Sequence, residues 1–274
     1  MKSKHIWSIT ALAGLSAAAG LIFGAAVTPD GTVTGYLGQL EVTNYNLTSG
    51  HEVVFKTDYE KQNWTGNVFA YPISSAAVIN TAAEWWSGGA QEHLEAQDFD
   101  SGRLIVTMKD DGTKQPFRWA NLSTTQQGQI GTSTTGPTIL NFVRGDRSNE
   151  RTTTIPRVRA VVLGDIVHSR PYYLPNNGAP VLFVGANDGM LHAFDADTAA
   201  GGDELWAYVP SMLIPNLKAL AGSSSTSPIY THTYFVDGGL NVGDAVISGS
   251  NKRCAVSAIT PMSCVMSITA APCC

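Results

Sequence analysis

The segment from residue 181 to 210 constrains the fold more than any other part of the sequence. Two apolar runs flank Asn187-Asp188-Gly189, residues that supply the positive φ angles a tight hairpin needs. After an Asp-rich loop, a third run carries Trp206 and Tyr208. Three antiparallel strands that end in a tryptophan predict most of a β-propeller blade.

Two other segments resemble parts of this unit. Residues 64–71 repeat its Gly-x-x-x-Ala-aromatic core, and residues 234–248 begin a further copy. We therefore predict an all-β fold, a β-propeller with quinoprotein-like blades that is incomplete and carries short helical insertions. The expected helices lie at 76–86, 93–97 and 211–221, the last with Ser211 as N-cap, while 122–138 reads as a loop.

The composition agrees with an exported all-β protein. Of the 274 residues only 14% are charged, and there are 27 Gly together with 6 Trp, 9 Tyr and 9 Phe. The net charge of −5 has the wrong sign for a protein that binds nucleic acid through a basic face. The many aromatic side chains and the small net charge argue against a disordered chain.

Residues 1–26 form a predicted signal peptide. Lys2, Lys4 and His5 precede an uncharged run from 6 to 26, and small residues favour cleavage after Ala26. The alternative is an uncleaved anchor, because 21 uncharged residues can just span a bilayer. No later segment is long and apolar enough to cross a membrane as a helix, so we expect an exported protein with no membrane span after cleavage.

The four cysteines all lie in the last 21 residues, at Cys254, Cys264, Cys273 and Cys274. Their spacing fits no zinc site. They have no partner in the body of the chain, and their disulfide state stays open.

Five motifs, at 141–150, 157–174, 185–198, 204–217 and 234–247, follow one another in a characteristic order. Together they make roughly 27–250 resemble the C-terminal β-propeller of type IV pilus tip-associated adhesins, the PilY/PilC-type pilus biogenesis proteins. The resemblance implies a non-enzymatic role in pilus assembly, surface attachment and twitching motility. It implies minor pilins or the pilus tip, and a host or abiotic surface, as partners. The implied location is the periplasm, outer surface or pilus tip of a Gram-negative bacterium.

The resemblance also divides the chain and leaves parts of the family pattern unmatched. The expected regions are a signal peptide (1–26), the opening region of the propeller with first strands and a helical insertion (27–140), propeller blades (141–250) and an unaligned Cys-containing tail (251–274). Since a blade takes about 40–50 residues, we expect a truncated copy whose ring does not close. Full-length family members carry a calcium loop that is absent here, so no cofactor is expected in this chain.

Few residues qualify as site candidates. Asp195, Asp197 and Asp203 come nearest to a calcium loop but lack its central Gly and final Glu, and a polar turn is the alternative. Arg144-Gly145-Asp146 spells the integrin-binding tripeptide, with a structural role as the alternative.

No catalytic residue is predicted. Asp165 and His168 lie beside Ser169, but adjacent residues of a strand point to opposite faces, so His168 and Ser169 cannot act together as base and nucleophile. Two other functions stay open: a quinoprotein-like dehydrogenase that uses pyrroloquinoline quinone, and a periplasmic assembly scaffold that binds through strand edges.

Overall fold

The computed structural model describes residues 52–242 without 75, 77, 176–178, 198–199 and 226–228, and outside these limits only the backbone of strands. The predicted signal segment lies outside the described residues, apart from Ala26 in the short strand β1 (Ala26–Val27), which pairs with β2 (Val33–Thr34). The described chain is mostly sheet with few helices, and its sheets form no closed barrel.

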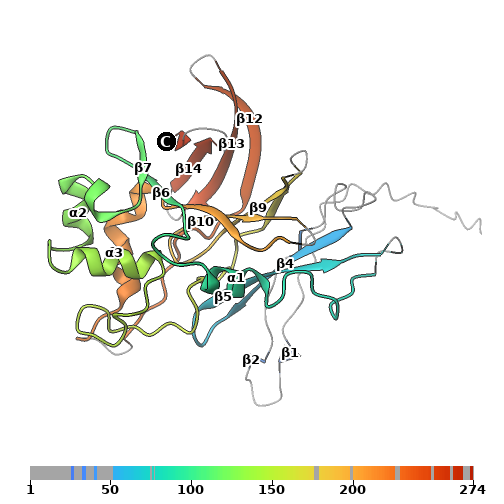
Figure 1. Cartoon of the computed structure of the whole chain (residues 1–274), viewed down its shortest axis with the longest axis horizontal. Helices are drawn as coiled ribbons and strands as arrows, with labels where there is room; N and C mark the ends of the chain where they lie inside the picture. The colour runs from blue at the N-terminus through green and yellow to red at the C-terminus, as the bar shows by residue number, and fades with distance from the viewer. Residues whose placement is uncertain are drawn as a thin grey trace, which may run out of the picture.

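The central element is a six-stranded sheet in the order β7-β6-β11-β10-β9-β8 (Figure 1). Strands β8 to β11 are consecutive in the chain and antiparallel, whereas β6 adds to the edge of β11 in parallel. The bounds are β6 (Ile105–Met108), β7 (Lys114–Pro116), β8 (Tyr172–Leu174), β9 (Val181–Gly185), β10 (Leu191–Asp195) and β11 (Glu204–Tyr208).

Two further sheets flank the central one. On one side β3 (Leu40–Glu41) extends the hairpin of β4 (Val53–Glu60) and β5 (Thr65–Pro72). Later in the chain, four antiparallel strands form a second consecutive meander: β12 (Leu240–Ile247), β13 (Ser250–Ile259), β14 (Met262–Ser267) and β15 (Pro272–Cys273). The Cys-containing tail is therefore part of a sheet, in which Cys254 lies opposite Ser267 and Cys264 opposite Ser257.

The helices α2, α3 and η3 pack together beside the central sheet, whereas α1 packs against β5 (Figure 1). Their bounds are α1 (Gly89–Ala96), η2 (Trp119–Asn121), α2 (Thr124–Ile130), α3 (Gly136–Arg144) and η3 (Ser211–Ala221). The loop predicted for 122–138 is wrong, because Ser123 and Gln126 form a capping box that starts α2 and Pro137 suits the first turn of α3.

Other local predictions are corrected as well. The described residues of 76–86 form no helix, with Ile79 in an isolated β-bridge to Ile73, and the helix α1 begins later, at Gly89. Residues 211–221 are helical but of the 3₁₀ type, with Pro215 inside and Pro210 rather than Ser211 as N-cap. In the β9–β10 connection only Gly189 has a positive φ, of 96°.

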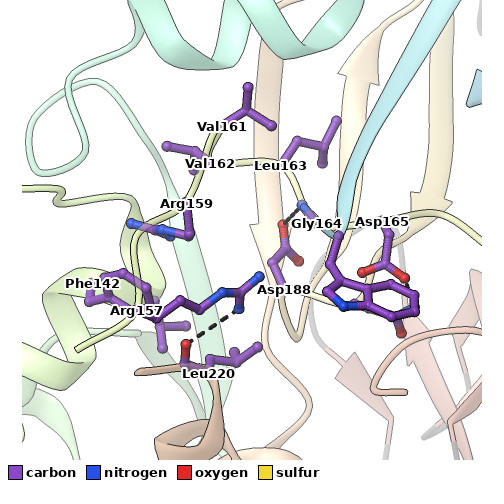
Figure 2. A pocket seen from close by; sticks show the side chains of 13 residues that line it. Phe142, Arg157, Arg159, Val161, Val162, Leu163, Gly164, Asp165, Asp188 and Leu220 are labelled. Carbon is purple, nitrogen blue, oxygen red and sulfur yellow. Dashed lines mark hydrogen bonds between the residues drawn. The ribbon is translucent and has the colours of Figure 1, made fainter. Parts of the chain in front are cut away.

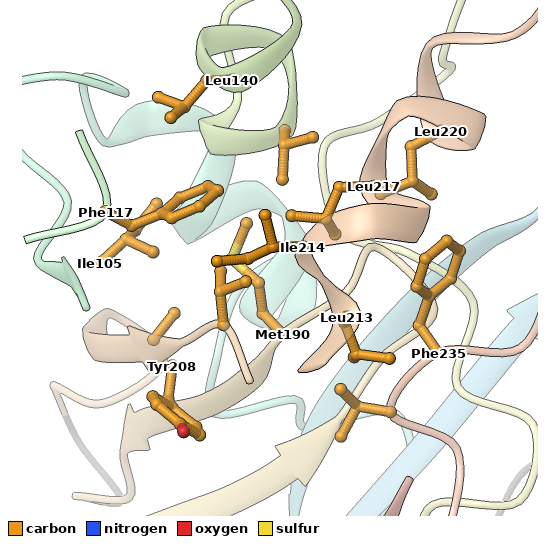
Figure 3. Close-up of a cluster of buried hydrophobic side chains, with 14 of the residues drawn as sticks. Ile105, Phe117, Leu140, Met190, Tyr208, Leu213, Ile214, Leu217, Leu220 and Phe235 are labelled. Atoms are coloured by element: carbon orange, nitrogen blue, oxygen red, sulfur yellow. The ribbon is translucent and has the colours of Figure 1, made fainter. Parts of the chain in front are cut away.

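The central strands β9 and β10 are buried on both faces. Phe183 and Leu191 belong to a core that also contains Ile214 and Leu217 of η3, and Figure 3 shows these two residues of η3 facing Met190 and Phe117. Leu182 and Val184 join a second core under the β4–β5 hairpin and α1. Successive residues of a strand face opposite sides, so a strand covered on both sides is apolar throughout. This explains the uninterrupted apolar run of β9.

Glycines allow the hairpin to lie against the segment that precedes the central sheet. A Cβ atom added to Gly66 of β5 would lie 2.2 Å from the carbonyl oxygen of Gly164, and Thr65 forms a β-bridge to Gly164. Close approach of two backbones is therefore the reason for glycine at this position.

We predict opposite effects for two Gly→Ala changes. Gly66→Ala should lower the free energy of unfolding by about 1–3 kcal/mol, because the new methyl group collides with backbone. Gly128→Ala, inside α2 with nothing within 4 Å of the added Cβ, should raise it by about 0.5–1 kcal/mol. Urea denaturation of both variants checks this, and equal effects would contradict the packing of β5 on Gly164.

Candidate functional site

A chain of four buried charges links the central sheet to the segments around it. Glu204, the first residue of β11, accepts two hydrogen bonds from the Arg103 guanidinium, at 2.7 and 2.8 Å. His192 of β10 bonds Glu204 through Nδ1 at 2.7 Å and Asp188 through Nε2 at 3.1 Å. The Asp188 carboxylate also accepts the backbone N–H groups of Gly164 and Met190. Two cations and two anions thus balance in the interior.

The pKa values of His192 and Glu204 reflect the mutual stabilisation of these buried charges. Burial alone would lower the pKa of His192, but Asp188 and Glu204 outweigh it and raise this pKa to about 9. Burial alone would raise the pKa of Glu204, but attraction to Arg103 and hydrogen bonding to His192 lower it to about 2. Because each ring nitrogen faces a carboxylate, both carry a proton and His192 is an imidazolium.

A second polar cluster lies beside this chain and joins segments that are far apart in sequence. Asn187 donates to the Asp165 carboxylate at 2.8 Å and accepts the N–H of Phe235 at 2.9 Å. His232 Nε2 lies 2.7 Å from the same Asp165 oxygen. His168 Nδ1 lies 2.5 Å from Asp237, which also accepts the backbone N–H of His168. Each histidine therefore has its own carboxylate.

A small cavity of about 10 Å³ separates the two groups of charges (Figure 2). Its polar side-chain lining includes Arg157, Arg159, Asp165, Asn187 and Asp188. In Figure 2 the Arg157 guanidinium bonds the Leu220 carbonyl, and Asp188 bonds the N–H of Gly164. This volume holds about one water molecule, so the cavity is too small for a cofactor.

Asp165, His168 and Ser169 do not form a catalytic unit. Asp165 pairs with His232 rather than His168, and the buried Ser169 hydroxyl accepts the backbone N–H of Gly185. The histidine and the serine are thus engaged with different parts of the fold.

Arg144 of the Arg-Gly-Asp tripeptide is 1% exposed. Its guanidinium donates to the carbonyls of Phe117 and Phe99, at 3.0 and 2.8 Å. Gly145 ends α3 with φ 123°, and the Asp146 carboxylate accepts the N–H of Ser148. The Arg144 side chain thus holds the end of α3 against Phe99, which precedes β6, and Phe117, which follows β7.

The three aspartates of the loop before β11 have separate contacts. Asp195 Oδ1 accepts the N–H of Asp197 at 2.9 Å. Asp203 lies 2.8 Å from His93 Nδ1. Within the described residues, no group of three or more His, Cys, Asp or Glu side chains could hold a metal ion.

No family model and no solved structure matches the chain, but curated proteins do. It is 30% identical over 220 residues to the "Type IV pilus biogenesis factor PilY1 homolog" of Xylella fastidiosa, covering 70% of this chain and 16% of that protein. It is 31% identical over 224 residues to the "Type IV pilus biogenesis factor PilY1" of Pseudomonas aeruginosa strain PAK, covering 69% of this chain and 18% of that protein.

These matches confirm the resemblance inferred from the five motifs. The chain therefore belongs to a class of type IV pilus biogenesis proteins. Over the matched region the chain is of the PilY1 type. It spans about one sixth of the length of the curated relatives. Among the described residues, no helix is long and apolar enough to span a membrane.

Sequence reasoning missed Arg103, Glu204 and His232 as members of these networks. Arg103 and Glu204 lie 101 positions apart, and neither stands in a recognisable spacing. The only available signal was a charged residue at the start of an otherwise apolar strand, since a buried charge needs a partner.

We predict that stability depends on pH through His192 and Glu204. The folded-state pKa of His192, about 9, exceeds the ordinary 6.5, so its contribution is complete below pH 6.5 and is lost as the pH rises through 9. The contribution of Glu204, with a pKa of about 2, is present above pH 4.5 and is lost as the pH falls through 2. Chemical denaturation from pH 5 to 10 should show an alkaline loss on the order of 3 kcal/mol. In His192→Gln that loss should be much smaller, and an unchanged alkaline limb would show that His192 is not its source.

A second prediction separates the two interpretations of the Arg-Gly-Asp tripeptide. Arg144→Met removes the donor to two carbonyls and should lower the free energy of unfolding by about 1–3 kcal/mol. Asp146→Asn keeps the acceptor oxygen for Ser148 and should change it by less than about 0.5 kcal/mol. Thermal unfolding of both variants gives the comparison. An Arg144→Met variant as stable as wild type would contradict a structural role for Arg144.

Proposed function

We propose that this chain is a non-enzymatic component of a type IV pilus system that supports pilus assembly, surface attachment and twitching motility. The observation that carries the proposal is the sequence match of about 30% identity over some 220 residues to PilY1 proteins of two organisms. Those proteins are named pilus biogenesis factors. The proposed location is outside the inner membrane, at the periplasm, cell surface or pilus tip, with minor pilins and a host or abiotic surface as partners.

We further propose that the sheets are blades of a β-propeller. Strands β8 to β11 and β12 to β15 are two successive antiparallel meanders of four strands each, which is the arrangement of propeller blades. The strands β6 and β7 add to the outer strand β11 and cover its edge, as expected for a protein that avoids open strand edges. The binding surface then consists of the loops and connections between blades.

The internal pairing of polar side chains favours binding over catalysis. His192 bonds both Asp188 and Glu204, and Glu204 bonds Arg103, so these side chains act as structural groups. The proposed function therefore places recognition at the exposed connections rather than in the interior.

Deletion and complementation of the gene in its own bacterium test the role. Deletion should reduce surface pili, measured as sheared pilin, and shrink the twitching zone. The full chain should restore both, whereas a matched version without residues 2–26 should restore neither because it is not exported. Normal piliation and twitching in the deletion strain would refute the proposed function.

A further inference from the structure

Four rings form a continuous face beside the second polar cluster. The Trp64 ring stacks on His232 with centroids 3.6 Å apart, Tyr234 meets His232 edge-on at 4.7 Å, and His168 lies 5.6 Å from Tyr234. We name Trp64, His168, His232 and Tyr234 the aromatic face. Its members come from the β4–β5 turn, the segment before β8 and the segment before β12.

Along the face, exposure increases from His232 through Tyr234 to His168. His232 is largely buried, with a side chain 9% exposed, whereas Tyr234 is 43% exposed and the His168 side chain 64% exposed. The outer two rings therefore contribute little to the core. Half-exposed aromatic side chains with a polar end are the residues that most often anchor protein partners.

The rings are held in place from behind. Asp237 fixes His168 through Nδ1 at 2.5 Å, and Asp165 fixes His232 through Nε2 at 2.7 Å. Asn187 donates to Asp165 and holds the backbone of Phe235, next to Tyr234. A side chain whose orientation is already fixed loses little entropy on binding a ligand, so such a face is preorganised.

Trp64 adopts a backbone conformation that is unfavourable for its type. Its φ is 54°, a left-handed value that is a true outlier for a bulky residue. Strain of this kind persists where the surrounding structure enforces it and often accompanies a functional role. Here the strained turn places the indole ring against His232.

The carboxylates of Asp165 and Asp237 lie directly behind the face. They also act on Tyr59: burial raises the pKa of Tyr59, and the neighbouring Tyr234, Asp165 and Asp237 raise it further. Arg157, which attracts Asp165, is buried, stacks on Tyr230 at 3.5 Å and donates to the Leu220 carbonyl. The positive charge of Arg157 is therefore engaged in these internal contacts.

We propose that the aromatic face binds an arginine side chain of a protein partner. A guanidinium is planar and stacks on aromatic rings, and it carries the charge that complements Asp165 and Asp237.

Arginine binding by the aromatic face does not depend on the pilus role. Binding in solution can fail while deletion of the gene still abolishes piliation, and the reverse can also occur. The two proposals are therefore tested separately.

The test is a titration of the full chain, labelled with ¹⁵N-histidine, with Nα-acetyl-arginine amide. The imidazole resonances of His168 and His232 should shift saturably. The citrulline analogue has nearly the same shape without the charge and should bind at least about tenfold more weakly.

Two variants localise the effect. Tyr234→Ala should abolish the saturable shift of His232. His93→Ala should leave both shifts unchanged, because His93 forms a similar pair with Asp203 in another part of the fold. Near-UV circular dichroism verifies that both variants are folded, and if Tyr234→Ala is not, the arginine–citrulline comparison on the wild-type chain decides.

Several results would overturn the inference. They are the absence of a saturable shift, equal binding of citrulline, loss of binding in His93→Ala, or persistence of binding in folded Tyr234→Ala. Saturable shifts with neutral monosaccharides but not with arginine would assign the face to a carbohydrate instead.

Discussion

The ion pair between Arg103 and Glu204 is the interaction on which the rest of the structure depends. Both side chains are almost fully buried, at 1% and 0% exposure, and neither could stay charged there alone. Arg103 also donates to the carbonyl of Arg144 at 2.5 Å, which ends α3. One guanidinium thus joins the end of α3 to β11, and through Glu204 it orients His192 and its partner Asp188 in the β9–β10 turn.

This arrangement separates residues that hold the fold from residues that can meet a partner. Asp188, next to Asn187 in the same turn, belongs to the buried chain of charges, whereas Asn187 belongs to the cluster behind the aromatic face. The turn therefore connects the core of the central sheet to the surface near Tyr234. The Asn187-Asp188 turn, which is generic as a sequence motif, therefore supports both the buried chain of charges and the cluster behind the aromatic face.

The sequence predicted what depends on local pattern. The strands β9, β10 and β11 lie where apolar runs and turn residues placed them, and the five motifs identified the relatives. The prediction from the sequence was wrong for α2 and α3, because their Ser, Thr, Gln and Gly residues suggest a loop. The signals that start these helices were nevertheless present, in Ser123, Gln126 and Pro137. Asp165 and His232 lie 67 positions apart, and no sequence spacing indicates that they pair. Contacts of this kind are visible only in the folded structure.

A double-mutant cycle on Arg103 and Glu204 tests the central claim most directly. The free energy of unfolding is measured for wild type, Arg103→Lys, Glu204→Gln and the double variant. If the bidentate pair holds the end of α3 on the central sheet, each single change should be strongly destabilising. The double change should then lower the free energy of unfolding no more than either single change does. The coupling energy should then be on the order of 2–3 kcal/mol. Additive effects, with a coupling near zero, would contradict the account.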